Sequence, residues 1–183
     1  MASLILAILL FANPLLPQAP AADQPGGPAP DVPELANLSR FVGSWNSQFE
    51  ARPIPGISEG GSRKGAARGE WILEGRFLRQ EWTVEAAGTE PRISGLSMMT
   101  YDPMKRAYRM WGFSSTGGGP SEGEGTYDEH TKTFHWTARD TNGIITTTQA
   151  SFAKDGEENW TIVVKDGDGR VLANDGDELI MLL

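Results

Sequence analysis

The side chains best suited to chemistry are few in this 183-residue chain. It has no cysteine and two histidines, His130 and His135. The lack of cysteine excludes disulfides, thiolate nucleophiles and zinc–thiolate sites. A catalytic or metal-binding histidine needs polar partners and an inward orientation, whereas His130 falls in an expected turn and His135 on the polar side of an expected strand. We therefore predict two solvated histidines and no catalytic residue, metal site or cofactor.

Acidic side chains near the C-terminus could offer oxygen ligands to calcium. They are Asp166, Asp168, Asp175, Asp177 and Glu178. Their spacing does not match an EF-hand loop, because Arg170 stands at its fifth position. Hairpin turns in an acidic protein explain these residues more simply.

The run 114–119, Ser-Ser-Thr-Gly-Gly-Gly, has the composition of a phosphate-binding loop. Such a loop needs a strand before it and a helix after it. Here Pro120 and a glycine-rich strand follow, so we interpret the run as an ordinary loop. The sequence also lacks a Gly-x-Ser-x-Gly elbow, and no Ser-His-Asp arrangement suggests itself.

Large, polarisable side chains that strand alternation could direct inward are the predicted ligand-binding residues. They are Trp82, Met98, Tyr108, Met110 and Trp136. Methionine and aromatic side chains suit apolar ligands, but they also fill the solid cores of small barrels, and the two interpretations stay open. In the strand over 106–114 the opposite face, with Ala107, Trp111 and Phe113, is equally apolar.

A sequence motif that occurs twice indicates the elements that position these residues. Residues 101–110 begin with Tyr-Asp, carry a basic residue in sixth place and an aromatic one in eighth, and residues 127–136 repeat all three features. An Asp side chain can bond backbone groups just ahead of it and reverse the chain. The flanking residues are β-branched or aromatic and tend to alternate. Each copy therefore predicts strand, tight turn and strand.

The same pattern extends along the chain and predicts about ten short strands separated by turns. Their expected ranges are 45–52, 68–73, 76–85, 92–101, 106–114, 121–127, 133–139, 144–153, 159–165 and 170–182. A short helix is predicted over 33–41, where Leu35, Leu38 and Phe41 recur at helical spacing. We predict an all-β, up-and-down antiparallel barrel with a short N-terminal helix, closed by pairing of the last strand with the strand of Trp45.

Two long connections fall at one end of such a barrel. They are residues 53–67 and 114–120, and long loops without structure of their own are often functional lids. We expect this end to be the mouth of a cup. The helix over 33–41 is expected to close the opposite end.

The first 32 residues are predicted to lie outside the barrel. The apolar run Leu4–Leu16 is followed by small residues, which is typical of a secretory signal peptide, and residues 23–32 are rich in Pro and Gly. We predict a signal peptide at 1–22 cleaved after Ala21 or Ala22, a spacer at 23–32, a barrel domain at 33–183, and a periplasmic or extracellular location. A formal net charge of -8 argues against nucleic acid and anionic membranes as partners.

The motif Gly43-Ser44-Trp45 after a short helix resembles the Gly-x-Trp entry of lipocalins and other calycins. With residues 75–78, the Tyr101-Asp102 turn and residues 125–128, the chain from about residue 35 onward resembles a bacterial family known as domain of unknown function 1579. The resemblance implies a calycin-like barrel. It provides no catalytic residues that could be transferred to this chain.

Three functions are compatible with these features. The first is an exported barrel that binds a small, mostly apolar molecule in its cup. The second is an enzyme on the same barrel, an isomerase or hydrolase of a lipid-like substrate, which needs at least two inward polar residues joined by hydrogen bonds. The third is a protein-interaction module with an apolar patch on its outer wall. The oligomeric state is not predicted.

Overall fold

The computed structural model describes residues 26–51, 61–117, 119–152, 158–165, 167–168 and 171–174. Within them a 3-10 helix precedes ten strands. The elements are η1 (Pro33–Phe41), β1 (Gly43–Ala51), β2 (Gly61–Ile72), β3 (Phe77–Val84), β4 (Ile93–Asp102), β5 (Ala107–Ser114), β6 (Ser121–Asp128), β7 (Thr133–Arg139), β8 (Ile145–Phe152), β9 (Glu158–Lys165) and β10 (Val171–Asn174).

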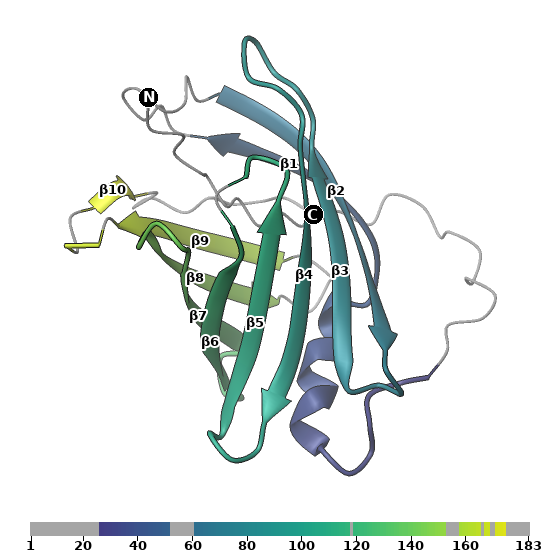
Figure 1. Ribbon diagram of the computed structural model, residues 1–183. Coiled ribbons are helices and arrows are strands. Elements are labelled where there is room, and N and C mark those ends of the chain that lie inside the picture. The colour runs from purple at the N-terminus through teal and green to yellow at the C-terminus, as the bar shows by residue number, and fades with distance from the viewer. Residues whose placement is uncertain are drawn as a thin grey trace.

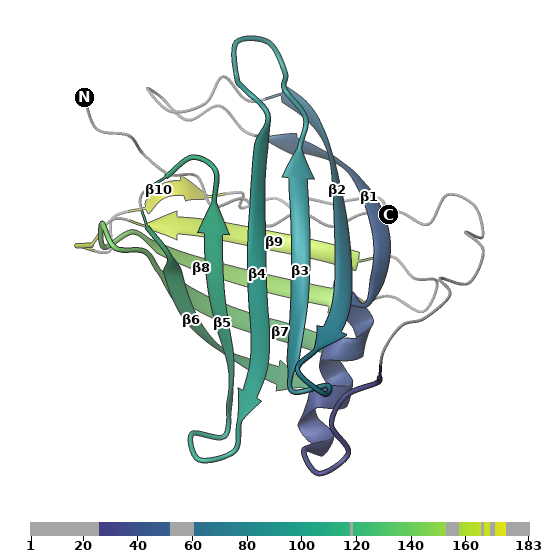
Figure 2. The ribbon, with the colours of Figure 1, turned by 45° about the vertical axis from the view of Figure 1, so that its right-hand side comes forward.

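Each strand pairs antiparallel with the next, in the order β1 to β10. The resulting sheet curls into a half-barrel, with η1 at one end (Figures 1 and 2). The predicted all-β meander with a short N-terminal helix is confirmed. In the described part of the chain β1 pairs with β2 and β10 with β9. The final stretch 175–183, which was expected to close the barrel, lies outside the described residues.

Strand β2 is longer than predicted, because residues 61–67 belong to it and not to a loop. The strand was not recognised over Gly65-Ala66-Ala67, because glycine and alanine show no alternation of apolar and polar side chains. The register explains these small residues: Ala67 lies between Trp45 of β1 and Trp82 of β3. The rest of the expected mouth loop, at residues 53–60, lies outside the described residues.

The two Tyr-Asp turns have the predicted structure. The Oδ1 atom of Asp102 accepts hydrogen bonds from the backbone N–H groups two and three residues ahead, at 2.9 and 3.2 Å. Asp128 repeats this at 2.8 and 3.2 Å, and the backbone donors hold the pKa of its carboxyl below the usual range. The basic residue in sixth place, Arg106 or Lys132, adopts a left-handed backbone conformation with φ of 54° or 55°.

Replacing Arg106 by glycine is expected to stabilise the protein. The left-handed conformation costs an L-residue about 1 kcal/mol that glycine does not incur, and the Arg106 side chain is exposed. Urea unfolding should therefore show a gain of roughly 0.5–1 kcal/mol. The matched control is Lys64→Gly, at an exposed position inside β2, which should lose a similar amount. A loss of stability in Arg106→Gly would contradict the strain argument.

The closed end of the half-barrel is built from η1 and a cluster of aromatic rings. Leu35, Leu38 and Phe41 are buried, as the helical spacing predicted. Phe134 lies among the rings of Phe41, Tyr108, Tyr127 and Trp136, with centroid distances of 4.5–5.6 Å. These rings form the apolar floor of the inner face.

Hydrogen bonds fix the helix to this floor and to the turns beside it. The Tyr108 hydroxyl donates to the carbonyl oxygen of Glu34 at 2.9 Å and accepts from Asn37 Nδ2 at 3.0 Å. The backbone N–H of Ala29 donates to the carbonyl of Gly75 at 3.1 Å, so part of the segment before η1 also packs against a turn.

Tyr108 should make the protein sensitive to alkali. Burial raises the pKa of its hydroxyl to about 12, whereas an unfolded chain ionises its tyrosines near pH 10. The free energy that the neutral Tyr108 hydroxyl contributes to folding is therefore fully present below pH 10. It is lost as the pH rises through 12, and the free energy of unfolding should fall by roughly 2 kcal/mol. Urea unfolding between pH 9 and 12 measures it. Tyr108→Phe should be less stable at pH 9 but should decline less steeply; parallel curves would contradict the assignment.

Candidate functional site

The inner face of the sheet is apolar near its closed end and becomes more polar toward the open end. Next to the aromatic floor, the register aligns apolar residues of neighbouring strands: Leu78, Met99, Met110 and, beyond Gly123, Ala138. The next row toward the open end is polar. We call it the polar row, and it consists of Gln80, Ser97, Gly112 and Ser121.

The polar row and the tryptophan beside it contain buried groups without hydrogen-bond partners. Gln80 is 1% exposed and Ser97 0% exposed, and neither the Gln80 amide atoms nor Ser97 Oγ has a hydrogen-bond partner among the described residues. Trp82, 4% exposed, likewise has no partner for its Nε1 within the described ranges. A buried polar group left unsatisfied costs about 1–3 kcal/mol, and most such groups in folded proteins have a partner. This concentration of them is the strongest indication of a binding site.

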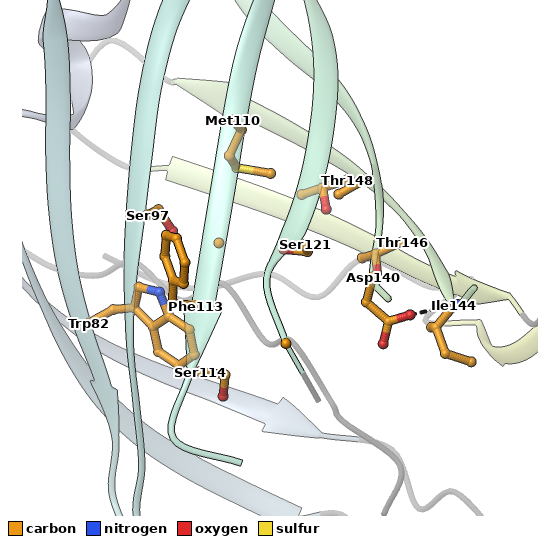
Figure 3. A pocket seen from close by; sticks show the side chains of 13 residues that line it. Trp82, Ser97, Met110, Phe113, Ser114, Ser121, Asp140, Ile144, Thr146 and Thr148 are labelled. Atoms are coloured by element: carbon orange, nitrogen blue, oxygen red, sulfur yellow. Dashed lines mark hydrogen bonds between the residues drawn. The ribbon is translucent and has the colours of Figure 1, made fainter. Parts of the chain in front are cut away.

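A pocket lies between two of these residues, Trp82 and Ser97, and strand β8 (Figure 3). Trp82 and Ser97 line one side, and Thr146, Thr148 and Ile144 line the other. Among the described residues, those that line it are Trp82, Ser97, Met110, Gly112, Phe113, Ser114, Gly119, Ser121, Ala138, Asp140, Ile144, Thr146 and Thr148. Its volume is about 40 Å³, which is enough for roughly three water molecules and far below the ~300–1,000 Å³ of sites that enclose drug-sized ligands.

Four of the five predicted ligand-binding residues lie on the inner face. Trp82 and Met110 line the pocket. Tyr108 and Trp136 are buried in the aromatic floor, with their centroids 6.1 Å apart, and do not line this pocket. The lower half of the expected cup is therefore filled by side chains. The structure also shows which face of β5 points inward. Tyr108 and Met110 are buried, and Phe113 is 46% exposed.

The expectation that Met98 points inward is wrong. Met98 pairs with Arg79 and Trp111 on the outer face, while its neighbour Met99 is buried beside Leu78 and Met110. The alternation of β4 is obscured because its inward positions include Gly95 and Ser97. Two adjacent methionines then leave no contrast between the faces.

Two buried polar residues were missed by the sequence analysis: Ser97, which lines the pocket, and its register partner Gln80, which is not among the described lining residues. A signal for Gln80 was present, because it stands between Leu78 and Trp82 on the apolar side of β3. A polar residue at an inward position of a strand is an exception that merits attention. Ser97 had no comparable signal, since its inward orientation follows from pairing with Gln80.

The other candidate chemical groups are exposed or lie outside the description. His130 and His135 are solvent-exposed, as predicted. In the acidic C-terminal set Asp168 is exposed, and its other members are not among the described residues. Within the described ranges, no three His, Asp or Glu side chains are grouped so that they could hold a metal ion. No helix in those ranges is long and apolar enough to cross a membrane.

The outer face carries a second cluster, which we call the outer patch. It consists of Phe77, Met98 and Trp111. The rings of Phe77 and Trp111 are 6.4 Å apart, and the Arg109 guanidinium lies 5.6 Å from the Trp111 ring centroid. Arg109 also forms ion pairs with Glu122 and Glu124.

Comparison with known proteins identifies a family and nothing more specific. No curated protein matches the chain. The sequence profile described as "Protein of unknown function (DUF1579)" matches residues 32–172, which span η1 and the sheet as far as the start of β10. This match covers most of the chain and agrees with the resemblance found in the sequence and with the barrel-like fold. The protein belongs to the DUF1579 family.

Proposed function

We propose that this protein is an exported half-barrel that binds a small, mostly apolar molecule, or the apolar end of a longer one, at the upper inner face. The observation that supports it is the pocket between Trp82 and β8, where apolar side chains meet buried polar groups without partners. A few oriented polar groups in a mainly apolar cleft are typical of small-molecule sites. The volume of 40 Å³ is well below the roughly 150 Å³ of a cavity that holds benzene, so the part of the ligand that enters is no larger than a short branched chain.

Isopropylbenzene is a suitable probe because it is neutral and carries a short branched chain. We expect it to shift the ¹H–¹⁵N resonance of the Trp82 indole N–H during a titration followed by NMR. Ala138→Leu should abolish the shift, because Ala138 lines the pocket and the larger side chain fills it. Thr137→Leu is the matched control, since the neighbouring residue is exposed on the other face. No saturable shift in the wild type, or equal shifts in both variants, would refute the proposal.

The enzyme hypothesis has less support. It requires inward polar residues that bond to each other, and neither the amide of Gln80 nor Ser97 Oγ has a hydrogen-bond partner. His135 and Arg139 are exposed on the outer face. A nucleophilic serine needs an adjacent base, which Ser97 lacks among the described residues. Binding is therefore the function that we favour.

Export is the second part of the proposal, and the apolar run Leu4–Leu16 supports it. When the full chain is expressed in a bacterium with its own N-terminus, we expect the mature protein outside the cytoplasm. Intact-mass spectrometry should place the new N-terminus after Ala21 or Ala22. A cytoplasmic protein that retains Leu4–Leu16 would contradict export and leave the binding site unaffected.

Interaction through the outer patch is a second candidate function, supported by the ring pair of Phe77 and Trp111. The occupant that we favour is a second copy of the chain. Both charge signs border the patch, because Arg79 and Arg109 lie beside Glu81 and Glu122, and a two-fold contact can place each cation against an anion of the other copy. Light scattering should show a dimer that Trp111→Glu dissociates. A monomeric wild type at 100 μM, a concentration on the order of weak dimer affinities, would exclude it.

A further inference from the structure

We propose that the ligand is uncharged and carries a hydrogen-bond acceptor, such as a ketone or ester carbonyl, that is held by Trp82 Nε1–H and Ser97 Oγ–H. This inference rests on the proposed binding function and specifies its chemistry. Both groups are buried and have no hydrogen-bond partner in the part of the chain that the structure describes, and their residues line the same pocket. A plain hydrocarbon would leave both of them unsatisfied.

The requirement for an acceptor follows from the type of group on the wall. An indole N–H can only donate, and a serine hydroxyl can rotate to donate as well. The two residues come from neighbouring strands: Trp82 pairs with Gly95, and Ser97 lies one inward position further along β4. Figure 3 shows the indole nitrogen and the serine hydroxyl on the same side of the pocket. One carbonyl oxygen has two lone pairs and can accept from both.

The charge of the ligand follows from the rest of the lining. Asp140 is the one charged residue among the described lining residues, and it is an anion. Its Oδ1 accepts from the backbone N–H groups of Asn142 and Ile144 at 2.9 and 2.8 Å, so it stabilises the turn. In the part of the lining that the structure describes, no cation is present that could neutralise a carboxylate or phosphate. Burying an unpaired charge is costly, and an uncharged acceptor is therefore the class that fits.

The test compares two ligands of equal heavy-atom number, acetophenone and isopropylbenzene, whose Kd values are measured by NMR titration. In Ser97→Ala, the Kd of acetophenone should rise roughly three- to tenfold relative to that of isopropylbenzene, which is the effect of one lost hydrogen bond. Trp82→Phe, which keeps a ring but removes the N–H donor, should change the ratio in the same direction. Ser94→Ala on the outer face of β4 is the matched control and should leave the ratio unchanged.

The outcomes separate this inference from the proposed function. If isopropylbenzene binds and neither variant changes the ratio, the acceptor is not recognised and this inference fails, although the pocket still binds apolar molecules. If neither ligand binds the wild type, the proposed function fails. The Ser97→Ala variant is expected to fold, because the substitution removes a buried hydroxyl that has no partner among the described residues. Its free energy of unfolding should equal or exceed that of the wild type. A wild-type ratio that is already equal to that of Ser97→Ala also overturns the inference.

Discussion

Gly69→Ala is expected to destabilise the protein by about 3 kcal/mol or more. A Cβ atom at this position would overlap the carbonyl oxygen of Phe41 and lie 2.9 Å from its carbonyl carbon and 3.4 Å from Val42 Cα. These are backbone atoms at the junction of η1 and β1, and they cannot move aside as a flexible side chain could. The helix end or β2 must shift, and either movement disturbs the floor beneath the site. Urea unfolding measures the loss.

Gly27→Ala is the matched control for this prediction. A Cβ at Gly27 meets nothing within 4 Å, and the residue is exposed. The same change should therefore alter the free energy of unfolding by less than about 0.5 kcal/mol. Equal effects of the two substitutions would show that the close approach of β2 to the end of η1 is not part of the folded structure.

Phe134→Ala is expected to cost about 3–5 kcal/mol, because it removes a fully buried ring and leaves a cavity. Its ring is stacked with that of Trp136 at a centroid distance of 5.6 Å and lies edge-on to Tyr108 at 5.1 Å. Such pairs contribute beyond the area that they bury. The near-ultraviolet circular dichroism of the surrounding rings should weaken together with the loss of stability.

Two further substitutions make this measurement specific. Phe134→Leu keeps most of the apolar volume and should cost less than Phe134→Ala. Met104→Ala removes a large apolar side chain that is 93% exposed and should have almost no effect. A loss below about 1 kcal/mol in Phe134→Ala would mean that the floor is loosely packed. The upper inner face would then lack a rigid support.

The class of fold and the two Tyr-Asp turns could be predicted from local sequence. Asp102 and Asp128 mark their turns through side-chain bonds to the next few residues, and local interactions of this kind are readable from local sequence. The helical spacing of Leu35, Leu38 and Phe41 was equally local. Trp82 was predicted to be inward because β3 alternates clearly, whereas β5 shows two equally apolar faces, so the inward position of Met110 needed the structure.

The polar groups that lie inside, and the space left between them, depend on how the strands pair and could not be predicted from local sequence. Ser97 and Met99 were assigned to the inner face by pairing with β3 and β5, since β4 alone shows too little contrast between its faces. The polar row exists through the register of four strands. The pocket is the space that remains after side chains from several strands and loops have packed together. No single segment of the sequence determines its size. A candidate site made of neutral residues far apart in the chain has no motif, and so its chemistry becomes visible only when the strands are brought together.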